Sequence, residues 1–226
     1  MTRRADHAYA ATRMAARLGD MPNEELWQRL DLARRLGPWL EDARATPLRH
    51  WLTRLAAATP FHDLEGTLRA EWREAVAETA NWLPAPERPA ILWLATLHDL
   101  PGLQAERSGT LAMRAASAAA PTRETEALAR LPAGDLARLW QAEWRRRLAP
   151  AALGAVTIAG PFLEALLLPD LAIAAETTAQ LRRRFRRHAG EPAASFFYLA
   201  LLWIEFVRTR GAVMRRATLQ TGRAAA

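Results

Sequence analysis

The chain contains no cysteine, and all 31 of its basic residues are arginines. The lack of cysteine excludes a disulfide framework, a thiolate metal site and a thiol nucleophile. The lack of lysine, together with the abundance of alanine, is typical of a GC-rich coding bias. The formal net charge of +7 over 226 residues still has a physical effect, because it favours contact with acidic proteins, phosphate groups or anionic lipids.

Long hydrophobic runs are also missing, although a membrane-spanning helix needs about 20 mostly apolar residues. Glu205 interrupts the apolar segment 195–211, "SFFYLALLWIEFVRTRG". Prolines and acidic residues interrupt the segment 153–175 in the same way. The first twenty residues are charged throughout and lack the apolar region of a signal peptide. We therefore expect a cytoplasmic protein in which 195–211 is a buried core helix, since helices that are apolar on every side are normally buried.

No stretch alternates apolar and polar residues as a strand does, and β-branched residues are scarce. Apolar residues recur instead with helical spacing, so we predict an all-α fold of roughly eight to ten helices. The low-complexity segment 109–123 is the expected linker between an N-terminal helical bundle (1–108) and a C-terminal bundle (124–226). The last helix is expected to run from about Pro192 to Leu219, and Pro101 and Gly102 are expected to break or bend an earlier one.

The nine tryptophans recur at positions expected to face the core; the core set comprises Trp27, Trp39, Trp72, Trp93, Trp140, Trp144 and Trp203. There is no glycine-rich phosphate loop, no nucleophile elbow and no paired-carboxylate site. We accordingly expect no catalytic residue, no cofactor and no metal.

A minority hypothesis concerns the pairs His62-Asp63 and His98-Asp99. The segment "LATLHDLPG" (94–102) resembles the motif of the HD-domain phosphohydrolases, all-α enzymes in which a divalent metal activates water. That resemblance implies a metal set of His62, His98 and Asp99, with Asp135 or Asp170 as the distal ligand. The lysine that usually follows the motif is missing here. The simpler interpretation is that His98 caps a helix or faces solvent.

The cluster "LRRRFRRH" (181–188) is a second candidate site. Successive helical positions point about 100° apart, so we expect its five arginines to surround the helix; they are Arg182, Arg183, Arg184, Arg186 and Arg187. The cluster lacks the interleaved polar residues that read bases. We therefore expect a solvated or protein-contacting helix end, and regard nucleic-acid binding or a role as a helical scaffold as less favoured alternatives.

Three segments in order resemble the C/d-type subunits of archaeal- and vacuolar-type (A/V-type) rotary ATPases. The first, 6–21, "DHAYAATRMAARLGDM", carries an aromatic residue and an arginine four positions later, Tyr9 and Arg13. The second, 90–109, is an apolar run followed by Asp99 and a polar tail, with Gly102 where the family usually has asparagine. The third, 197–217, is an apolar run that leads into glutamate and arginine.

The resemblance implies a non-catalytic, funnel-like protein that connects the central stalk to the membrane ring of proteolipid subunits. Such a protein couples ATP hydrolysis or synthesis to ion transport and is attached peripherally to the membrane, where anionic lipid could help. Because the chain is shorter than we expect for the family, one of the three related helical bundles is expected to be reduced or absent. The implied partner-binding residues are Tyr9, Arg13, Asp99, Glu205, Arg208 and Arg210.

Within the last helix we expect two environments. Phe196, Leu199, Trp203 and Phe206 are expected to lie in the core. Glu205 and Arg208 are expected at the exposed, polar end of the helix, where charge-assisted hydrogen bonds to a partner could form.

Overall fold

The fold is known from a computed structural model that describes residues 3–107, 122–132, 134–148 and 175–224. These residues form helices and no strand, which confirms the expected all-α fold. The α-helices are α1 (Arg3–Gly19), α2 (Glu24–Asp31), α3 (Leu36–Arg44), α4 (Arg49–Leu52), α5 (Phe61–Asn81), α6 (Arg88–Trp93), α7 (Leu100–Arg107), α8 (Arg123–Ala129), α9 (Leu136–Arg147), α12 (Ala175–Arg187) and α13 (Pro192–Ala224). Two short 3₁₀ helices, η1 (Ala85–Glu87) and η2 (Leu94–Asp99), precede α6 and α7.

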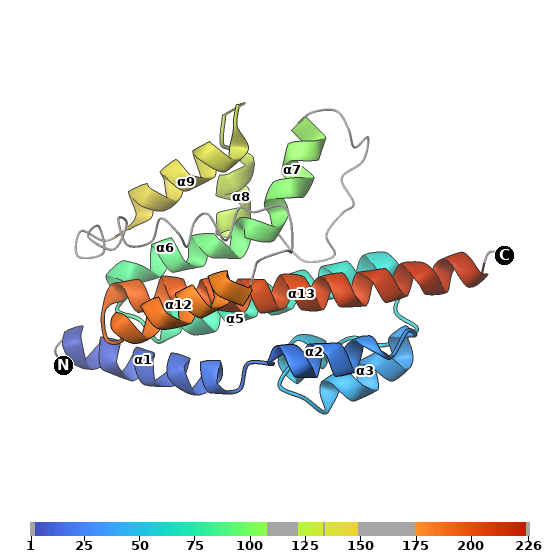
Figure 1. Cartoon of the computed structure of the whole chain (residues 1–226). Helices are drawn as coiled ribbons and strands as arrows, with labels where there is room; N and C mark the ends of the chain where they lie inside the picture. Colours follow the sequence, from blue (N-terminus) through green and yellow to red (C-terminus); the bar gives the residue numbers. More distant parts are fainter. Residues whose placement is uncertain (1–2, 108–121, 133, 149–174, 225–226) are drawn as a thin grey trace.

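Helix α13 lies at the centre of the molecule and runs alongside α5 (Figure 1). Its residues 193–202 are all buried, because α12, α1 and α5 pack against the helix and Trp144 of α9 contacts Phe196 at 5.2 Å between ring centroids. Phe196, Leu199 and Phe206 are buried as expected. Trp203 is only partly buried and lies at the edge of the core. No helix in the described ranges is long and apolar enough to cross a membrane.

The other tryptophans of the expected core set are buried, and several use their indole N–H within the protein. Trp72 Nε1 donates to the carbonyl oxygen of Leu94 at 3.1 Å, and Trp140 Nε1 donates to Thr96 Oγ1 at 2.8 Å. These bonds tie α5 and α9 to the segment that joins α6 to α7. Burying an indole without a partner for its N–H costs free energy, so the bonds allow large rings to fill the core.

Polar side chains set where several helices begin. Asn23 accepts a hydrogen bond from the backbone N–H of Leu26 at 2.9 Å and starts α2, and Asp135 caps α9 through the N–H of Arg138 at 3.1 Å. Such caps satisfy backbone donors that the helix leaves free. The expected break at Pro101 and Gly102 lies instead in η2 just before them, and both residues belong to α7, whose first turn tolerates proline.

Helices from both expected bundles meet at α13, which packs against α12 as well as α5 and α1. The expected linker, 109–123, lies outside the described residues except for its last two, where Thr122 caps α8. The division of the chain into two bundles stays a prediction.

Candidate functional site

Glu205 is not at an exposed helix end, as the sequence led us to expect, but is buried in the middle of α13. Trp51 Nε1 donates to Glu205 Oε1 at 2.7 Å, and His50 Nε2 lies 3.3 Å from the same oxygen. The expectation was wrong because His50 and Trp51 of α4, far away in the sequence, cover this part of α13. A carboxylate surrounded by apolar residues costs free energy unless it is paired, and the short helix α4 supplies both partners.

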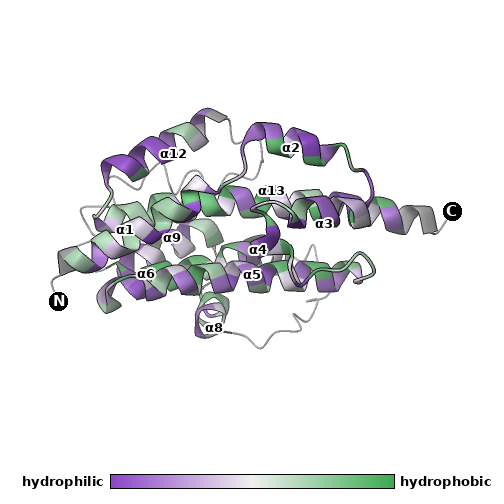
Figure 2. Ribbon diagram, turned by 90° about the horizontal axis from the view of Figure 1, so that it is seen from below, coloured by the Kyte–Doolittle hydropathy of each residue, from purple (hydrophilic) through white to green (hydrophobic). Residues whose placement is uncertain are grey.

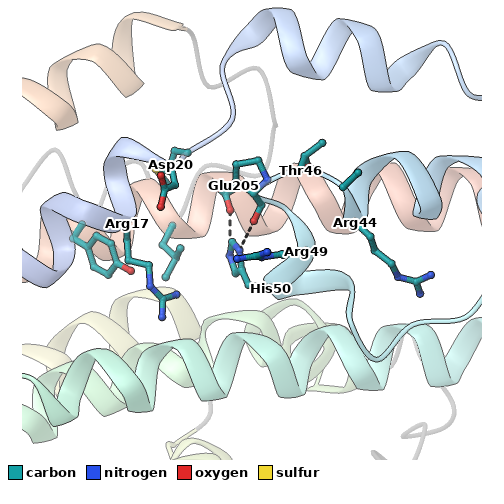
Figure 3. A pocket seen from close by; sticks show the side chains of 12 residues that line it. Arg17, Asp20, Arg44, Thr46, Arg49, His50 and Glu205 are labelled. Atoms are coloured by element: carbon teal, nitrogen blue, oxygen red, sulfur yellow. Dashed lines mark hydrogen bonds and ion pairs between the residues drawn. The ribbon is translucent and has the colours of Figure 1, made fainter.

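Glu205 borders a groove of about 710 Å³, which we call the His50 groove (Figure 3). Arg17 and Asp20 line it from the end of α1, and Arg44, Thr46, Arg49 and His50 line it from the α3–α4 region. The remaining wall is made by α13, with Tyr198 and Leu202 beside Glu205. Burial raises the pKa of Tyr198, so its hydroxyl stays protonated at neutral pH.

The arrangement of His50 limits the chemistry of the groove. Its Nδ1 lies 2.7 Å from the carbonyl oxygen of Pro47, and its Nε2 faces Glu205. A carbonyl oxygen can only accept, so Nδ1 carries a proton, while Nε2 is shielded from solvent and has no hydrogen bond in the described residues. Because Nε2 is shielded in this way and faces a carboxylate, His50 is not placed to take a proton from a substrate as a general base.

Arg208 and Arg210 are engaged inside the protein, and they point to different neighbours. Arg208 forms two hydrogen bonds with Glu24 of α2, at 2.7 and 2.8 Å, and its guanidinium lies 4.5 Å from the ring centroid of Trp27. Arg210 Nε bonds both carboxylate oxygens of Glu65 on α5, at 2.8 and 3.0 Å. Both side chains remain partly exposed. They fasten α13 to α2 and α5.

Asp99 belongs to the same network as Arg210. Arg69 Nε donates to Glu65 Oε1 at 2.9 Å, and Arg69 also approaches Asp99 at 3.5 Å, as does Arg73. Burial pushes the pKa of Glu65 and of Asp99 upward, but the neighbouring arginines, with His98 beside Asp99, hold both pKa values below their usual range. The structure thus connects two of the expected partner-binding residues through ion pairs within the molecule.

This network predicts that the protein loses stability in acid in two steps. Burial lowers the pKa of His98 below its ordinary value of 6.5, so protonating it favours the unfolded chain as the pH falls below about 6.5. Glu65 and Asp99 stabilise the fold while ionised, and this contribution is lost as the pH falls through their lowered pKa values. Urea unfolding at a series of pH values measures both steps. His98→Leu should remove the first step and leave the contribution of Glu65 to the second, and a free energy of unfolding that stays constant from pH 8 to pH 3 would contradict the prediction.

The residues of the phosphohydrolase hypothesis do not form a common site in the described residues. His62 is largely exposed on α5 and pairs with its neighbour Asp63 at 3.2 Å. His98 is buried at the end of η2, 3.2 Å from Asp99. The simpler interpretation of His98 was wrong, because its side chain is shielded from solvent and its ring nitrogens form no capping hydrogen bond in the described residues. Asp135 caps α9, and Asp170 lies outside the described residues. No group of three or more possible ligands able to hold a metal occurs in the part of the chain that the structure describes.

Tyr9 and Arg13 lie on the exposed face of α1. The Arg13 guanidinium lies 5.9 Å from the ring centroid of Tyr9 and 5.4 Å from that of Trp82. The Tyr9 side chain is 55% exposed. These are the two members of the expected partner-binding set that take part in no ion pair within the described part of the chain.

The arginines of α12 form a stripe, which the sequence analysis did not anticipate. Leu181 and Phe185 bury one side of the helix against α13. Arg183, Arg186 and Arg187 are exposed on the opposite side, at the i, i+3, i+4 spacing that places residues on one face. We call these three residues the α12 arginine face. Figure 2 shows α12 at the periphery of the molecule, with much of its ribbon coloured as hydrophilic. The expectation that the cluster surrounds the helix was wrong, because the apolar residues at 181 and 185 fix its orientation.

No acidic side chain of the described residues pairs with the α12 arginine face. Some other surface arginines are neutralised locally, as Arg17 is by Glu78 at 2.8 Å and Arg54 by Glu71 at 2.7 Å. Three adjacent guanidinium groups without a counter-charge produce a positive potential that an acidic surface can lower. The pattern 183, 186, 187 was visible in the sequence, but its meaning depended on knowing the buried side of the helix.

Comparison of the chain with known protein families, curated proteins and solved structures finds no match. The resemblance to the rotary ATPase family therefore depends on the three sequence segments alone.

Proposed function

We propose that the protein is a non-catalytic docking subunit that binds an acidic partner through the α12 arginine face. The observation that carries the proposal is the exposure of Arg183, Arg186 and Arg187 on one side of α12 without a carboxylate beside them in the described residues. Guanidinium groups form forked, charge-assisted hydrogen bonds with carboxylates and suit protein interfaces. The net charge of +7 adds long-range attraction for the same kind of partner.

The three-segment resemblance names the assembly in which we place this protein. The partners would be the central-stalk subunits and the proteolipid ring of a V-type or archaeal-type rotary ATPase, and the location would be the cytoplasmic side of the membrane. Tyr9 and Arg13, exposed on α1, offer a second contact of mixed aromatic and cationic character. Such pairs are common in protein interfaces.

The other expected partner-binding residues have an indirect role in this proposal. Arg208 bonds Glu24, Arg210 bonds Glu65, and Glu205 accepts from Trp51. Engaging a partner directly would require breaking these contacts. They instead hold α13 in place, and α13 carries both α12 and α1.

Reversing the charge of the face, with Arg183→Glu, Arg186→Glu and Arg187→Glu combined, is expected to weaken partner binding. Exposed ion pairs contribute about 0.2–1 kcal/mol each, so losing three should lower affinity by a factor between about three and somewhat more than one hundred. The measurement is co-sedimentation of the purified protein with membranes that contain the rotary ATPase, with the co-sedimenting ATPase subunits identified by mass spectrometry.

The matched control combines Arg29→Glu, Arg34→Glu and Arg35→Glu. These three arginines are also exposed and unpaired in the described part of the chain, and the change in net charge is the same. The control should bind as the original protein does at moderate salt. An equal loss of partner binding in both triple variants would mean that binding depends only on net charge, and would contradict a specific role for the α12 arginine face.

A further inference from the structure

The His50 groove has the size and the mixed lining of a small-molecule site. Its volume of about 710 Å³ falls within the range of roughly 300–1,000 Å³ that is typical of ligand pockets. Three separate parts of the chain form its walls, namely the end of α1, the α3–α4 region and α13 (Figure 3). It lies apart from the α12 arginine face, whose three residues do not line it.

Most charges in the groove are already compensated. Glu205 receives the indole N–H of Trp51 and faces His50, and Arg17 forms hydrogen bonds at 2.8 and 2.9 Å with Glu78. Arg44 donates from Nε to the carbonyl oxygen of Leu52 and from one terminal nitrogen to that of Leu55, which holds the α3–α4 region in place. These contacts shape the groove and engage most of its charged side chains, although Arg44 keeps its positive charge because carbonyl oxygens do not neutralise it.

Arg49 is the exception on the α4 side. Its side chain is exposed, lines the groove next to His50, and has no acidic partner in the described residues. Asp20 faces the groove from α1 and likewise has no side-chain partner there. Met21, Pro47 and Leu202 add apolar surface. The groove therefore offers one free guanidinium, an apolar wall and one acidic group opposite.

We infer that the His50 groove binds a small organic acid that carries a single anionic group, a carboxylate or a phosphate ester. Arg49 would hold the anionic group in a forked pair of hydrogen bonds. The carbon body of the ligand would pack against Met21 and Leu202. Asp20 disfavours ligands with a second anionic group, because that group would face its carboxylate. A basic protein in general attracts an anion more strongly when the anion carries more charge. A preference for a single anionic group would therefore indicate a specific binding site.

The test is a thermal melt of the purified full-length protein with sodium butyrate, glycerol 3-phosphate, trisodium citrate and sodium chloride at matched ionic strength. A ligand that binds only the folded state raises Tm in a saturable manner. Butyrate or glycerol 3-phosphate should raise Tm in this way, and citrate should raise Tm no more than sodium chloride does. In Arg49→Gln the ligand concentration that gives half of the maximal Tm shift should rise at least tenfold. Arg29→Gln, at an exposed position on α2, should leave that concentration unchanged.

A second variant tests the cavity itself. Ala45→Trp places a large ring at an exposed position that lines the groove, and should abolish the effect while the unliganded protein stays folded by circular dichroism. A vesicle arm with phosphatidic acid separates a lipid headgroup from a soluble ligand: binding to vesicles without any response to the soluble acids would overturn the inference. So would equal Tm shifts in the original protein and Arg49→Gln, or a larger shift with citrate than with butyrate and glycerol 3-phosphate.

Discussion

Replacing Trp72 with alanine is expected to destabilise the protein by about 3–5 kcal/mol, the range for large aromatic truncations in a core. Trp72 is fully buried on α5. Its ring centroid lies 4.8 Å from that of Trp203 and 5.5 Å from that of Phe206, so it joins α5 to α13. The variant also leaves the carbonyl oxygen of Leu94 without its indole donor. Urea unfolding followed by circular dichroism measures the change in free energy.

Trp203→Ala is the matched control for this prediction. The sequence alone placed Trp203 in the core, but its side chain is only partly buried. Trp203→Ala should therefore lower the free energy of unfolding clearly less than Trp72→Ala does, although the two rings are in contact. If Trp203→Ala were the more destabilising change, the packing described between α5 and α13 would be wrong.

Glu205→Ala is expected to destabilise the protein by about 1–3 kcal/mol, because it leaves the buried indole N–H of Trp51 without an acceptor. It also removes the carboxylate that faces His50. The expected cost stays below that of a fully buried ion pair, since the His50 side chain is 34% exposed and its Nε2 forms no hydrogen bond with Glu205.

Two further variants separate these contributions. Glu205→Gln keeps an oxygen that can accept from Trp51 but removes the charge next to His50, so it should cost less than Glu205→Ala. In Trp51→Phe the indole donor is gone, and adding Glu205→Ala should then cost less than it does alone, a coupling that a double-mutant cycle measures. A stability of Glu205→Ala equal to that of the original protein would contradict the contacts described for Glu205.

Much of the fold could be predicted from the sequence because helical periodicity is a local signal. The apolar residues from Phe196 to Phe206 predicted the central helix, and the recurrence of tryptophan at core-facing positions predicted that Trp72 is buried. Capping residues such as Asn23 and Asp135 also precede their helices in the sequence. These features depend on neighbours within a few positions along the chain.

The site could not be predicted in the same way, because its contacts join residues far apart in sequence. The partner of Glu205 is Trp51, that of Arg208 is Glu24, and that of Arg210 is Glu65. A charged residue beside an apolar run gives the same local pattern whether it faces solvent or a buried donor. The α12 stripe was missed for a related reason, since only the packing of Leu181 and Phe185 on α13 defines which arginines are exposed.

Site-specific photo-cross-linking in the source cells tests the proposed function most directly. A photoreactive amino acid at position 187, in the α12 arginine face, should cross-link to a central-stalk or ring subunit of the rotary ATPase, and the same amino acid at the exposed position 34 should not. Cross-links to ATPase subunits from position 187 alone are the result we predict. Cross-links to unrelated proteins only, or equal cross-linking from both positions, would contradict the proposal.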